Sequence, residues 1–503
     1  MDVSAWVRHR ADWSPARVAV HFEGADVTYA ELHERVSRLA AALAGGLAIG
    51  PGDRIAYLGY NSPLVLELLF ACARLGAILV PLNWRLTAAE HRGVLADAQP
   101  SALVAEAEFL GHAEALRADV PRLVACEPAA ARGGWRALDG PGDAPTPGAG
   151  DLAAPLLLVY TSGTTGRPKG AVLTQGALLW NALNSIAAHD LTSADHVLTV
   201  LPMFHVGGLN IHTTPALLAG ATITLARRFD PGETLDLIAA RRPTLLLTVP
   251  AVAQALSRHE RFAATDFSSL RAMCTGSSIV PEAVMRPWME RGVPVTQVYG
   301  MTESGPVAIA LSIADAARKV GSCGKPVAHS QARVVDAAGR DVAPGERGEI
   351  WLRGPNLMSG YWRNPDATAD AFADGWLRTG DVGHRDADGF YYIDDRVKDV
   401  VISGGENIYP AELEAVLADC PDIAEAAVIG RPDPTWGEIP IACIVPHPGA
   451  ALTRADVLAL FPNRLARYKH PRDVIFLNAL PRNAMGKIQK HDLRHHLSPP
   501  PQS

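Results

Sequence analysis

Short apolar segments that alternate with amphipathic ones constrain the fold of this chain most. Residues 53–59 read as a buried strand, residues 62–76 as a helix and residues 77–82 as a second strand. The alternation returns further along, with strands expected at 196–202, 221–229 and 244–250 and helices at 233–242 and 251–258. Strands joined through helices pair in parallel, so we predict α/β layers with doubly wound-type sheets in the N-terminal bulk.

The chain length requires more than one domain, because 503 residues exceed the roughly 250–300 residues that one hydrophobic core supports. From about Ala332 the pattern changes to short strands with Gly turns, which predicts a small β subdomain. After Arg396 the pattern changes again, to a compact α+β arrangement. We therefore predict a large domain over residues 1–397 and a smaller one over 398–503.

Several local features are also predictable. Residues 27–45 indicate a helix, because Thr28 is a suitable N-cap, Glu31 follows three positions later and apolar residues recur at helical spacing. The small domain should hold helices at 410–417 and 453–467. Residues 133–150, rich in Gly, Pro and Ala, read as a surface connection.

Composition and charge narrow the function classes. Hydrophobic residues make up 48% and charged residues 20%, which is typical of a globular enzyme. A net charge of −7 argues against a general electrostatic grip on nucleic acid, so no DNA or RNA partner is expected. The six cysteines are scattered, with no C-x-x-C pair and no His spacing typical of zinc sites, and we interpret them as reduced thiols.

The N-terminal segment carries charge throughout and lacks the apolar core of a signal peptide, so a cytoplasmic location is expected. The apolar stretch 64–82 is interrupted by Glu67 and Arg74 and is too broken to span a bilayer. Arginine pairs at 227–228 and 241–242 leave weak peripheral membrane contact open, although solvated pairs are the preferred interpretation. The sequence carries no signal for an oligomeric state.

Residues 158–170, LVYTSGTTGRPKG, run from a short apolar strand into a loop with four hydroxyls, three glycines and Lys169. Glycines let backbone N–H groups approach phosphate oxygens, hydroxyls add donors, and the lysine adds positive charge. The spacing departs from the Walker A pattern, because Pro168 and Gly170 stand where that pattern needs a glycine and a Ser or Thr. We predict a polyphosphate-binding loop outside the Walker class.

Five further segments follow this loop in a fixed order: TGSSIVP at 275–281, YGMTE at 299–303, WLRTGD at 376–381, DRVKDVVISGGENIYPAELE at 395–414 and PRNAMGK at 481–487. With the loop, they resemble the motifs of the adenylate-forming superfamily, which holds acyl- and aryl-CoA synthetases, firefly luciferase and the adenylation domains of peptide synthetases. The resemblance covers nearly the whole chain. It implies an AMP-binding N-terminal domain, a mobile C-terminal domain, and a ligase that joins a carboxylic acid to coenzyme A through an acyl-adenylate, using ATP and Mg²⁺.

The resemblance also implies roles for individual residues. In the nucleotide site, Glu303 and Thr165 would hold Mg²⁺, Thr302 would contact the α-phosphate, and Tyr299 and Gly300 would lie at the adenine, with Asp381 and Arg396 at the ribose. The phosphate grip would come from Thr161, Ser162, Gly163, Thr164, Thr165, Gly166 and Lys169, and the wall opposite Tyr299 from Gly276, Ser277 and Ser278.

The C-terminal motifs imply a second set of roles. Lys487 would bridge the substrate carboxylate and the α-phosphate, where charge develops during adenylation, whereas Lys490 reads as a solvated surface charge. Lys398 would be the hinge about which the C-terminal domain rotates, and Gly404 and Gly405 would line the pantetheine tunnel of coenzyme A.

The acid itself is less determined. The pocket is expected at His205, Gly207, Gly208, Gly276, Gly305 and Val307, where mostly apolar segments and paired glycines indicate a hydrophobic and fairly roomy site. His205 would gate this pocket, or lie along the route of the thiol, or be a core residue. Relatives that take a small dicarboxylate place an arginine after YGMTE, and residues 307–311 contain none. A medium- or long-chain fatty acid and an aromatic acid of the benzoate or hydroxycinnamate type both stay open.

Two other functions are considered. One is transfer of the acyl group to the phosphopantetheine of a carrier protein; the chain has no fused carrier motif to support it. The other is a nucleotide-binding sensor without catalysis, which retention of Glu303, Asp381, Arg396 and Lys487 disfavours.

Overall fold

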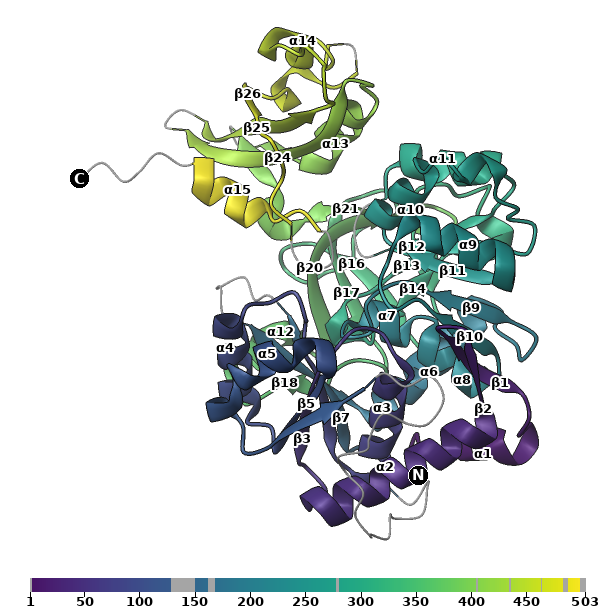
Figure 1. Ribbon diagram of the computed structural model, residues 1–503. Coiled ribbons are helices and arrows are strands. Elements are labelled where there is room, and N and C mark those ends of the chain that lie inside the picture. The colour runs from purple at the N-terminus through teal and green to yellow at the C-terminus, as the bar shows by residue number, and fades with distance from the viewer. Residues whose placement is uncertain are drawn as a thin grey trace.

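The computed structural model describes residues 2–127, 150–161, 168–276, 280–403, 406–433, 436–462, 464–482 and 487–497. They form a large body and, above it in Figure 1, a smaller domain that contains the C-terminal strands and helix α15 (Lys490–Leu497). The surface connection predicted at 133–150 lies outside the described residues except for Gly150. No described helix is long and apolar enough to cross a membrane.

The first sheet of the large body has the strand order β18-β8-β7-β4-β3-β5-β6. Its parallel part consists of β4 (Ile78–Pro81), β3 (Arg54–Leu58), β5 (Ala102–Glu106), β6 (Leu123–Cys126) and β7 (Pro155–Thr161). Strand β8 (Lys169–Thr174) runs antiparallel to β7, and β18 (Gly360–Tyr361) runs antiparallel to β8. The helix between β3 and β4 is α3 (Pro63–Leu75), which confirms the predicted strand-helix-strand unit.

The second sheet has the order β15-β14-β13-β12-β11-β9-β10-β1-β2. Its parallel strands are β1 (Val18–Phe22), β10 (Thr222–Leu225), β9 (His196–Thr199), β11 (Leu245–Thr248), β12 (Ala272–Gly276) and β13 (Val295–Tyr299). Its antiparallel edges are β2 (Ala25–Thr28), β14 (Ile309–Ala310) and β15 (Lys325–Pro326). One apolar core joins the two sheets, since it includes Leu157 of β7, Leu69 of α3 and Ile223 of β10.

The helices of the large body cover these sheets and connect their strands. They include α1 (Ala5–Trp13), α2 (Tyr29–Leu47), α4 (Ala88–Ala98), α6 (Gln175–Ala188), α7 (Val206–Asn210), α8 (Thr213–Ala219), α9 (Pro231–Arg241), α10 (Pro250–Ser257) and α11 (Glu282–Glu290). Helix α2 begins as predicted, because Thr28 and Glu31 form a capping box in which each side chain binds the other's backbone N–H.

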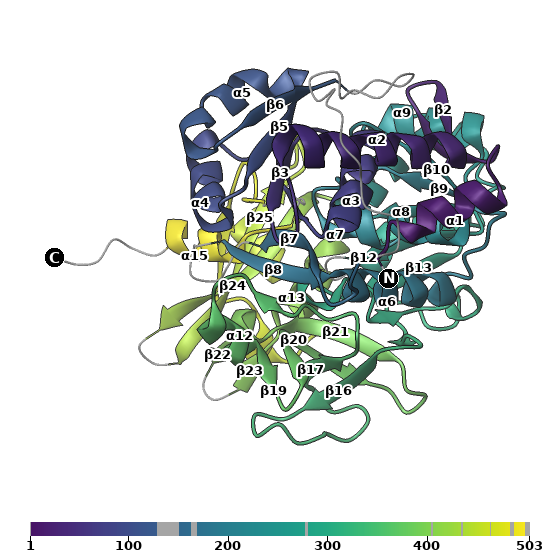
Figure 2. The same cartoon turned by 90° about the horizontal axis from the view of Figure 1, so that it is seen from below.

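The predicted β subdomain is confirmed. Strands β16 (Gln331–Val335), β17 (Gly348–Arg353), β20 (Trp376–Arg385) and β21 (Tyr391–Arg396) pair antiparallel, with β19 (Phe372–Ala373) added at β20 after helix α12 (Pro365–Ala371). Seen from below in Figure 2, these strands lie on the side of the molecule opposite α1 and α2.

The C-terminal domain follows a short 3-10 turn at Val397–Asp399. Its sheet contains β22 (Val401–Ser403), β23 (Glu406–Ile408), β24 (Ile423–Asp433), β25 (Gly437–Pro446) and β26 (Asp473–Phe476). Helix α13 (Pro410–Ala418) matches the prediction, but α14 (Arg454–Leu458) is much shorter than the helix predicted at 453–467. The physical reason is Pro462, which has no N–H to bond Leu458 and whose ring would clash with that carbonyl.

One arginine of the two pairs, Arg227, differs from the expectation of solvated charges. Arg227 is largely buried and contacts Glu106 at 2.9 Å and Glu108 at 2.5 Å. Arg241 pairs with Asp26 and Arg242 with Asp266. Three of the four arginines thus have a carboxylate partner, and the pair of Arg242 with Asp266 stays at the surface.

Candidate active site

The candidate site lies where strands of both sheets end and the β subdomain begins. Thr161 ends β7, Gly276 ends β12 and Tyr299 ends β13, so three of the predicted positions come from strand termini. Ligands of open α/β sheets bind outside the carboxyl ends of the strands, because loops there leave a crevice. The distribution of the motifs along the sequence therefore follows from the topology of the sheets.

Asp381, Tyr299 and Arg396 form one connected group at this edge. The Tyr299 hydroxyl donates to Asp381 Oδ2 at 2.8 Å, and Arg396 Nε lies 2.5 Å from Asp381 Oδ1. Asp381 on β20 and Arg396 on β21 are direct partners in the antiparallel register, which explains their contact. The neighbouring Asp381 charge raises the pKa of Arg396, and burial raises the pKa of Tyr299 well above its ordinary value. The carboxylate is thus held in a fixed orientation.

Glu303, Tyr361 and Lys169 form a second group of neighbouring side chains. Glu303 is part of a 3-10 turn, Thr302–Ser304, and is almost fully buried, as is Thr302. The Tyr361 hydroxyl donates to Glu303 Oε1 at 2.8 Å, and Lys169 Nζ lies 5.3 Å from the centroid of the Tyr361 ring. Burial raises the pKa of Glu303. A nearby cation would therefore stabilise the charged form of this carboxylate. A hard, oxygen-preferring ion such as Mg²⁺ suits such a ligand.

Lys487 reaches this group from the C-terminal domain. Burial and then the positive charge of Arg396 lower the pKa of Lys487 to about 8, while Asp381 acts in the opposite direction. Lys487 is therefore close enough to Asp381 and Arg396 for their charges to act on its ammonium. Lys490 differs from the expected surface charge, because it is only 14% exposed and forms an ion pair with Glu414 at 2.8 Å.

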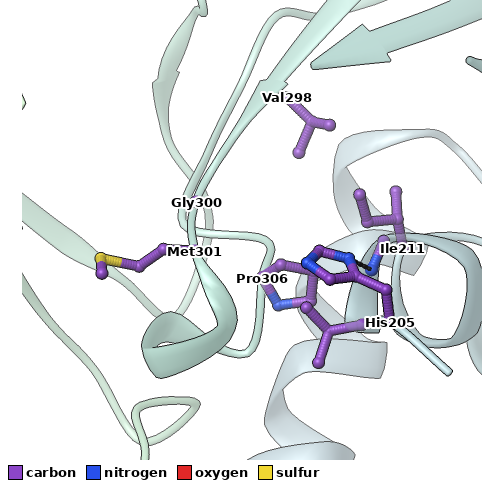
Figure 3. A pocket seen from close by; sticks show the side chains of 8 residues that line it. His205, Ile211, Val298, Gly300, Met301 and Pro306 are labelled. Atoms are coloured by element: carbon purple, nitrogen blue, oxygen red, sulfur yellow. Dashed lines mark hydrogen bonds between the residues drawn. The ribbon is translucent and has the colours of Figure 1, made fainter. Parts of the chain in front are cut away.

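A cavity opens beside the turn that holds Glu303 (Figure 3). It is narrow, with a volume of about 20 Å³ for the centres of water-sized molecules, and its walls are mostly apolar. The His205 ring lies between Pro306 and Ile211 in this view, whereas the Met301 side chain points away from it. Other wall residues are Val206, Gly207, Val298 and Gly300.

His205 is held in one ring state at this cavity. The Gly207 N–H donates to His205 Nδ1 at 3.0 Å, so the proton of the neutral ring is on Nε2. Burial lowers the pKa of His205 to about 4. The ring is therefore a neutral wall of the cavity.

At several glycines of the site, the backbone of another segment lies too close to leave room for a side chain. A Cβ on Gly208 would lie 2.3 Å from the Pro202 carbonyl oxygen, and one on Gly305 would lie 2.6 Å from the Asn356 carbonyl oxygen. Gly208 and Gly305, which were expected in the pocket, do not line this cavity, and a side chain at either position would clash with backbone. Similar contacts apply to Gly276, where a Cβ would lie 2.4 Å from the Val298 carbonyl oxygen, and to Gly300, where it would lie 1.8 Å from that of Pro306.

Val307 was also expected in the pocket. It is fully buried outside the cavity walls, and its N–H donates to Asn181 Oδ1 at 2.9 Å. Asn181 also donates to the Asn210 carbonyl at 2.7 Å, so it ties the segment after Glu303 to helix α7. Asn356 also holds this segment, because its side chain donates to the Ser304 carbonyl at 2.6 Å.

Asn181, Asn356 and Tyr361 were not predicted as site residues. A signal existed for Asn181, because it interrupts an apolar helical segment where an unpaired amide would be costly. For Tyr361 no sequence signal distinguishes a contact with Glu303 from ordinary burial.

The remaining predicted positions are Lys398 and a group outside the described residues. Lys398 is exposed in the turn after β21. Outside the described residues lie Ser162, Gly163, Thr164, Thr165, Gly166, Ser277, Ser278, Gly404 and Gly405.

Comparisons with known proteins agree with this geometry. Residues 7–362 match the family model described as AMP-binding enzyme, and residues 412–487 match that of the AMP-binding enzyme C-terminal domain. An indoleacetate–CoA ligase of Aromatoleum aromaticum is 50% identical, with 98% of each chain covered. A feruloyl-CoA synthase of Amycolatopsis is 44% identical, again over 98% of both. The ATP-bound crystal structure of MatB from Rhodopseudomonas palustris superposes with a TM-score of 0.91 at 33% identity, covering 99% of each chain.

Proposed function

The chain belongs to the AMP-binding enzyme family and is an AMP-forming acid–CoA ligase, and we propose that its acid is a short aromatic carboxylic acid. The reaction has two steps. The acid carboxylate first attacks the α-phosphorus of ATP and releases pyrophosphate, and the thiol of coenzyme A then displaces AMP from the acyl-adenylate. Membership in a family of ligases argues against the alternative of a nucleotide-binding sensor.

The walls of the cavity and the acids of the relatives carry the proposal of an aromatic acid. Two of the wall residues, Ile211 and Val298, are nearly fully buried, and we call them the inner wall. Mostly apolar walls of this kind suit the ring system of an aromatic acid. The relatives that act on indoleacetate and on ferulate support the same acid class.

The nucleotide half of the site would act through charge placement. Asp381 would accept hydrogen bonds from the ribose hydroxyls, because Arg396 and Tyr299 already fix the orientation of its carboxylate. The Tyr299 ring and Gly300 would lie at the adenine. Lys169 and the turn containing Thr302 would face the phosphates.

Mg²⁺ would supply Lewis-acid polarisation of the phosphates when bound. Glu303 would be its carboxylate ligand, because it is buried at the same turn as Thr302 and its raised pKa marks a charge that lacks solvation. Tyr361 would keep the carboxylate pointed toward the ion by its hydrogen bond to Oε1.

Lys487 would stabilise the charge that develops between the carboxylate and the α-phosphate. We expect Lys487→Ala to slow adenylation by about 10²–10³-fold, measured as acid-dependent pyrophosphate exchange. Thioester formation from supplied acyl-adenylate should fall far less, because that step does not need the bridge. Equal loss of both half-reactions would contradict this role.

The acid class is tested by a panel of straight-chain, branched and aromatic acids. Release of AMP is measured for each acid with ATP, with coenzyme A present or omitted, and with a phosphopantetheinylated carrier protein in place of coenzyme A. We expect the highest kcat/KM for aromatic acids with coenzyme A. Preference for long-chain fatty acids would refute the proposed acid, and a requirement for the carrier protein would refute the acceptor.

A further inference from the structure

Three buried polar residues, His189, His212 and Cys274, lie together at strand β12 of the second sheet, and Asn210 lies two positions before His212. We call these four residues the polar floor. His189 follows α6, His212 precedes α8, and Cys274 lies in β12. Every one of them is at most 3% exposed. The rings of His189 and His212 are 4.5 Å apart between centroids, and Cys274 Sγ lies 3.7 Å from His189 Nε2.

The hydrogen bonds of the polar floor are incomplete. His189 Nδ1 lies 2.9 Å from the Ser185 carbonyl, so this ring donates there and its Nε2 accepts. Neither ring nitrogen of His212, and neither side-chain amide atom of Asn210, has a partner within the described part of the chain. Buried polar atoms are nearly always paired, so unpaired atoms on two adjoining segments indicate a group that is absent here.

The polar floor adjoins the cavity through shared segments. Asn210 and His212 flank Ile211, which forms the inner wall. Val298, the other inner-wall residue, pairs in register with Gly276. Cys274 lies two residues before Gly276 on β12, and side chains two apart point to the same face of a strand, roughly 7 Å apart along it. The inner wall and Cys274 of the polar floor therefore belong to the same part of the core, where Ile211, Val298 and Cys274 form one buried cluster.

We infer that the polar floor binds a hydrogen-bond donor, an N–H or O–H, at the end of the aromatic acid that is distal to its carboxylate, with His212 as the acceptor. This inference rests on the proposed aromatic acid. Ile211 and Val298 would contact the faces of the ring system, while its polar atom passes between them to His212. Such a floor selects among aromatic acids, because an analogue without the donor leaves His212 buried and unpaired.

The charge state of the floor suits a neutral donor. Burial, assisted by the neighbouring His189, holds the pKa of His212 well below its ordinary value. Burial also raises the pKa of the Cys274 thiol to about 12. Burial likewise lowers the pKa of His189 to about 4, so all three groups are uncharged at neutral pH. A neutral N–H or O–H brings no unpaired charge into the core.

A metal ion is the competing occupant. The ligand atoms of His189, His212 and Cys274 all lie within 4.8 Å of one another. An ion there would require the thiol to lose its proton against the effect of burial, and three ligands leave a tetrahedral site incomplete. Metal content is therefore measured in the same experiment.

The experiment compares pairs of acids that differ only in the donor. The first pair is indole-3-acetate with benzothiophene-3-acetate, and the second is 4-hydroxycinnamate with 4-methylcinnamate, which separates an N–H from an O–H. The measured quantity is the ratio of kcat/KM within each pair in the pyrophosphate-exchange assay. This ratio is independent of the folded fraction, so a variant that folds poorly remains informative.

For the wild type we expect a ratio of at least about tenfold in favour of the donor acid in one pair. His212→Leu should bring that ratio near one, and His212→Gln, which keeps an acceptor, should restore part of it. His91→Leu is the matched control, since His91 is also fully buried but lies in α4, and it should keep the wild-type ratio.

Three outcomes would overturn the inference. A wild-type ratio near one for both pairs, with aromatic acids still used, would refute the polar floor but not the aromatic acid. A ratio in His212→Leu equal to that of the wild type would show that residues other than His212 select the donor acid. One zinc or copper ion per purified chain that disappears in Cys274→Ser would make the cluster a metal site. Failure of every aromatic acid would instead refute the proposed function itself.

Discussion

One carboxylate and two cations share a largely buried part of the site: Asp381, Arg396 and Lys487. Asp381 is neutralised by Arg396 at 2.5 Å, which leaves the Lys487 ammonium as the second positive charge of the group. Its pKa falls because burial removes water and Arg396 repels the charged form. A lysine tuned in this way is charged only over part of the physiological range.

This tuning predicts a pH dependence of adenylation. The ammonium is present below the pKa of about 8 and is lost as the pH rises through it, so kcat/KM for pyrophosphate exchange should fall above about pH 8. Lys487→Arg should be slower but flat to higher pH, because a guanidinium keeps its proton.

The readout is the pH profile of kcat/KM for MgATP, which reports the enzyme without nucleotide, in wild type and variant. An identical fall of both profiles above pH 8 would show that another group titrates. Thioester formation from supplied acyl-adenylate, measured over the same range, is the control for effects on folding.

At the scale of elements, strand ends and short turns position the site. The 3-10 turn Thr302–Ser304 presents Glu303, and the turn Val397–Asp399 joins the two domains directly after Arg396. In that second turn, Lys398 is exposed, so its side chain is not held by packing. A backbone rotation at this position would move the C-terminal domain as a unit, which agrees with the hinge proposed for Lys398.

Lys398→Pro should test this hinge, because proline fixes φ near −65° and prevents large rotation there. We expect adenylation within about threefold of wild type and thioester formation reduced at least about tenfold, since each tenfold corresponds to about 1.4 kcal/mol of barrier. The two half-reactions are measured separately.

Lys398→Ala is the matched control, and both of its half-reactions should stay near the wild-type rates. Thioester formation at the wild-type rate in Lys398→Pro would exclude rotation about this residue.

For the whole molecule, contacts between the domains hold the arrangement in which Lys487 adjoins Asp381. Arg347, just before β17, pairs with Glu412 of α13 at 2.6 Å and with Asp394 at 3.4 Å. The Arg347 guanidinium also lies 4.3 Å from the centroid of the Tyr409 ring. Arg347 therefore connects the β subdomain to the first turn of the C-terminal domain, and rotation would have to break this contact.

Loss of this contact should shift the balance between the half-reactions. The pair is partly solvated, so a coupling of about 0.2–1 kcal/mol is expected. Arg347→Ala should therefore lower the ratio of adenylation to thioester formation by about 1.4- to fivefold. A double-mutant cycle with Glu412→Ala measures the coupling.

Arg242→Ala, which breaks a surface pair with Asp266 within the large domain, is the control and should leave the ratio unchanged. Additive effects of Arg347→Ala and Glu412→Ala would show that their contact does not bias the domain arrangement.

The sequence by itself determined the strand and helix order, the β subdomain and the reaction class. Helix α2 and the strand-helix-strand unit were predictable because capping and apolar periodicity are local features of the chain. Each nucleotide motif was recognisable because its residues lie close together in the chain. The length of α14 was missed although its cause, Pro462, is visible in the sequence.

Only the tertiary structure decided which distant residues meet. The bonds from Tyr299 to Asp381 and from Tyr361 to Glu303, the approach of Lys487, and the polar floor all join segments far apart in the chain. Such contacts depend on how sheets and domains pack, and burial, which sets the charge states of Glu303, Lys487 and His212, exists only once they have packed.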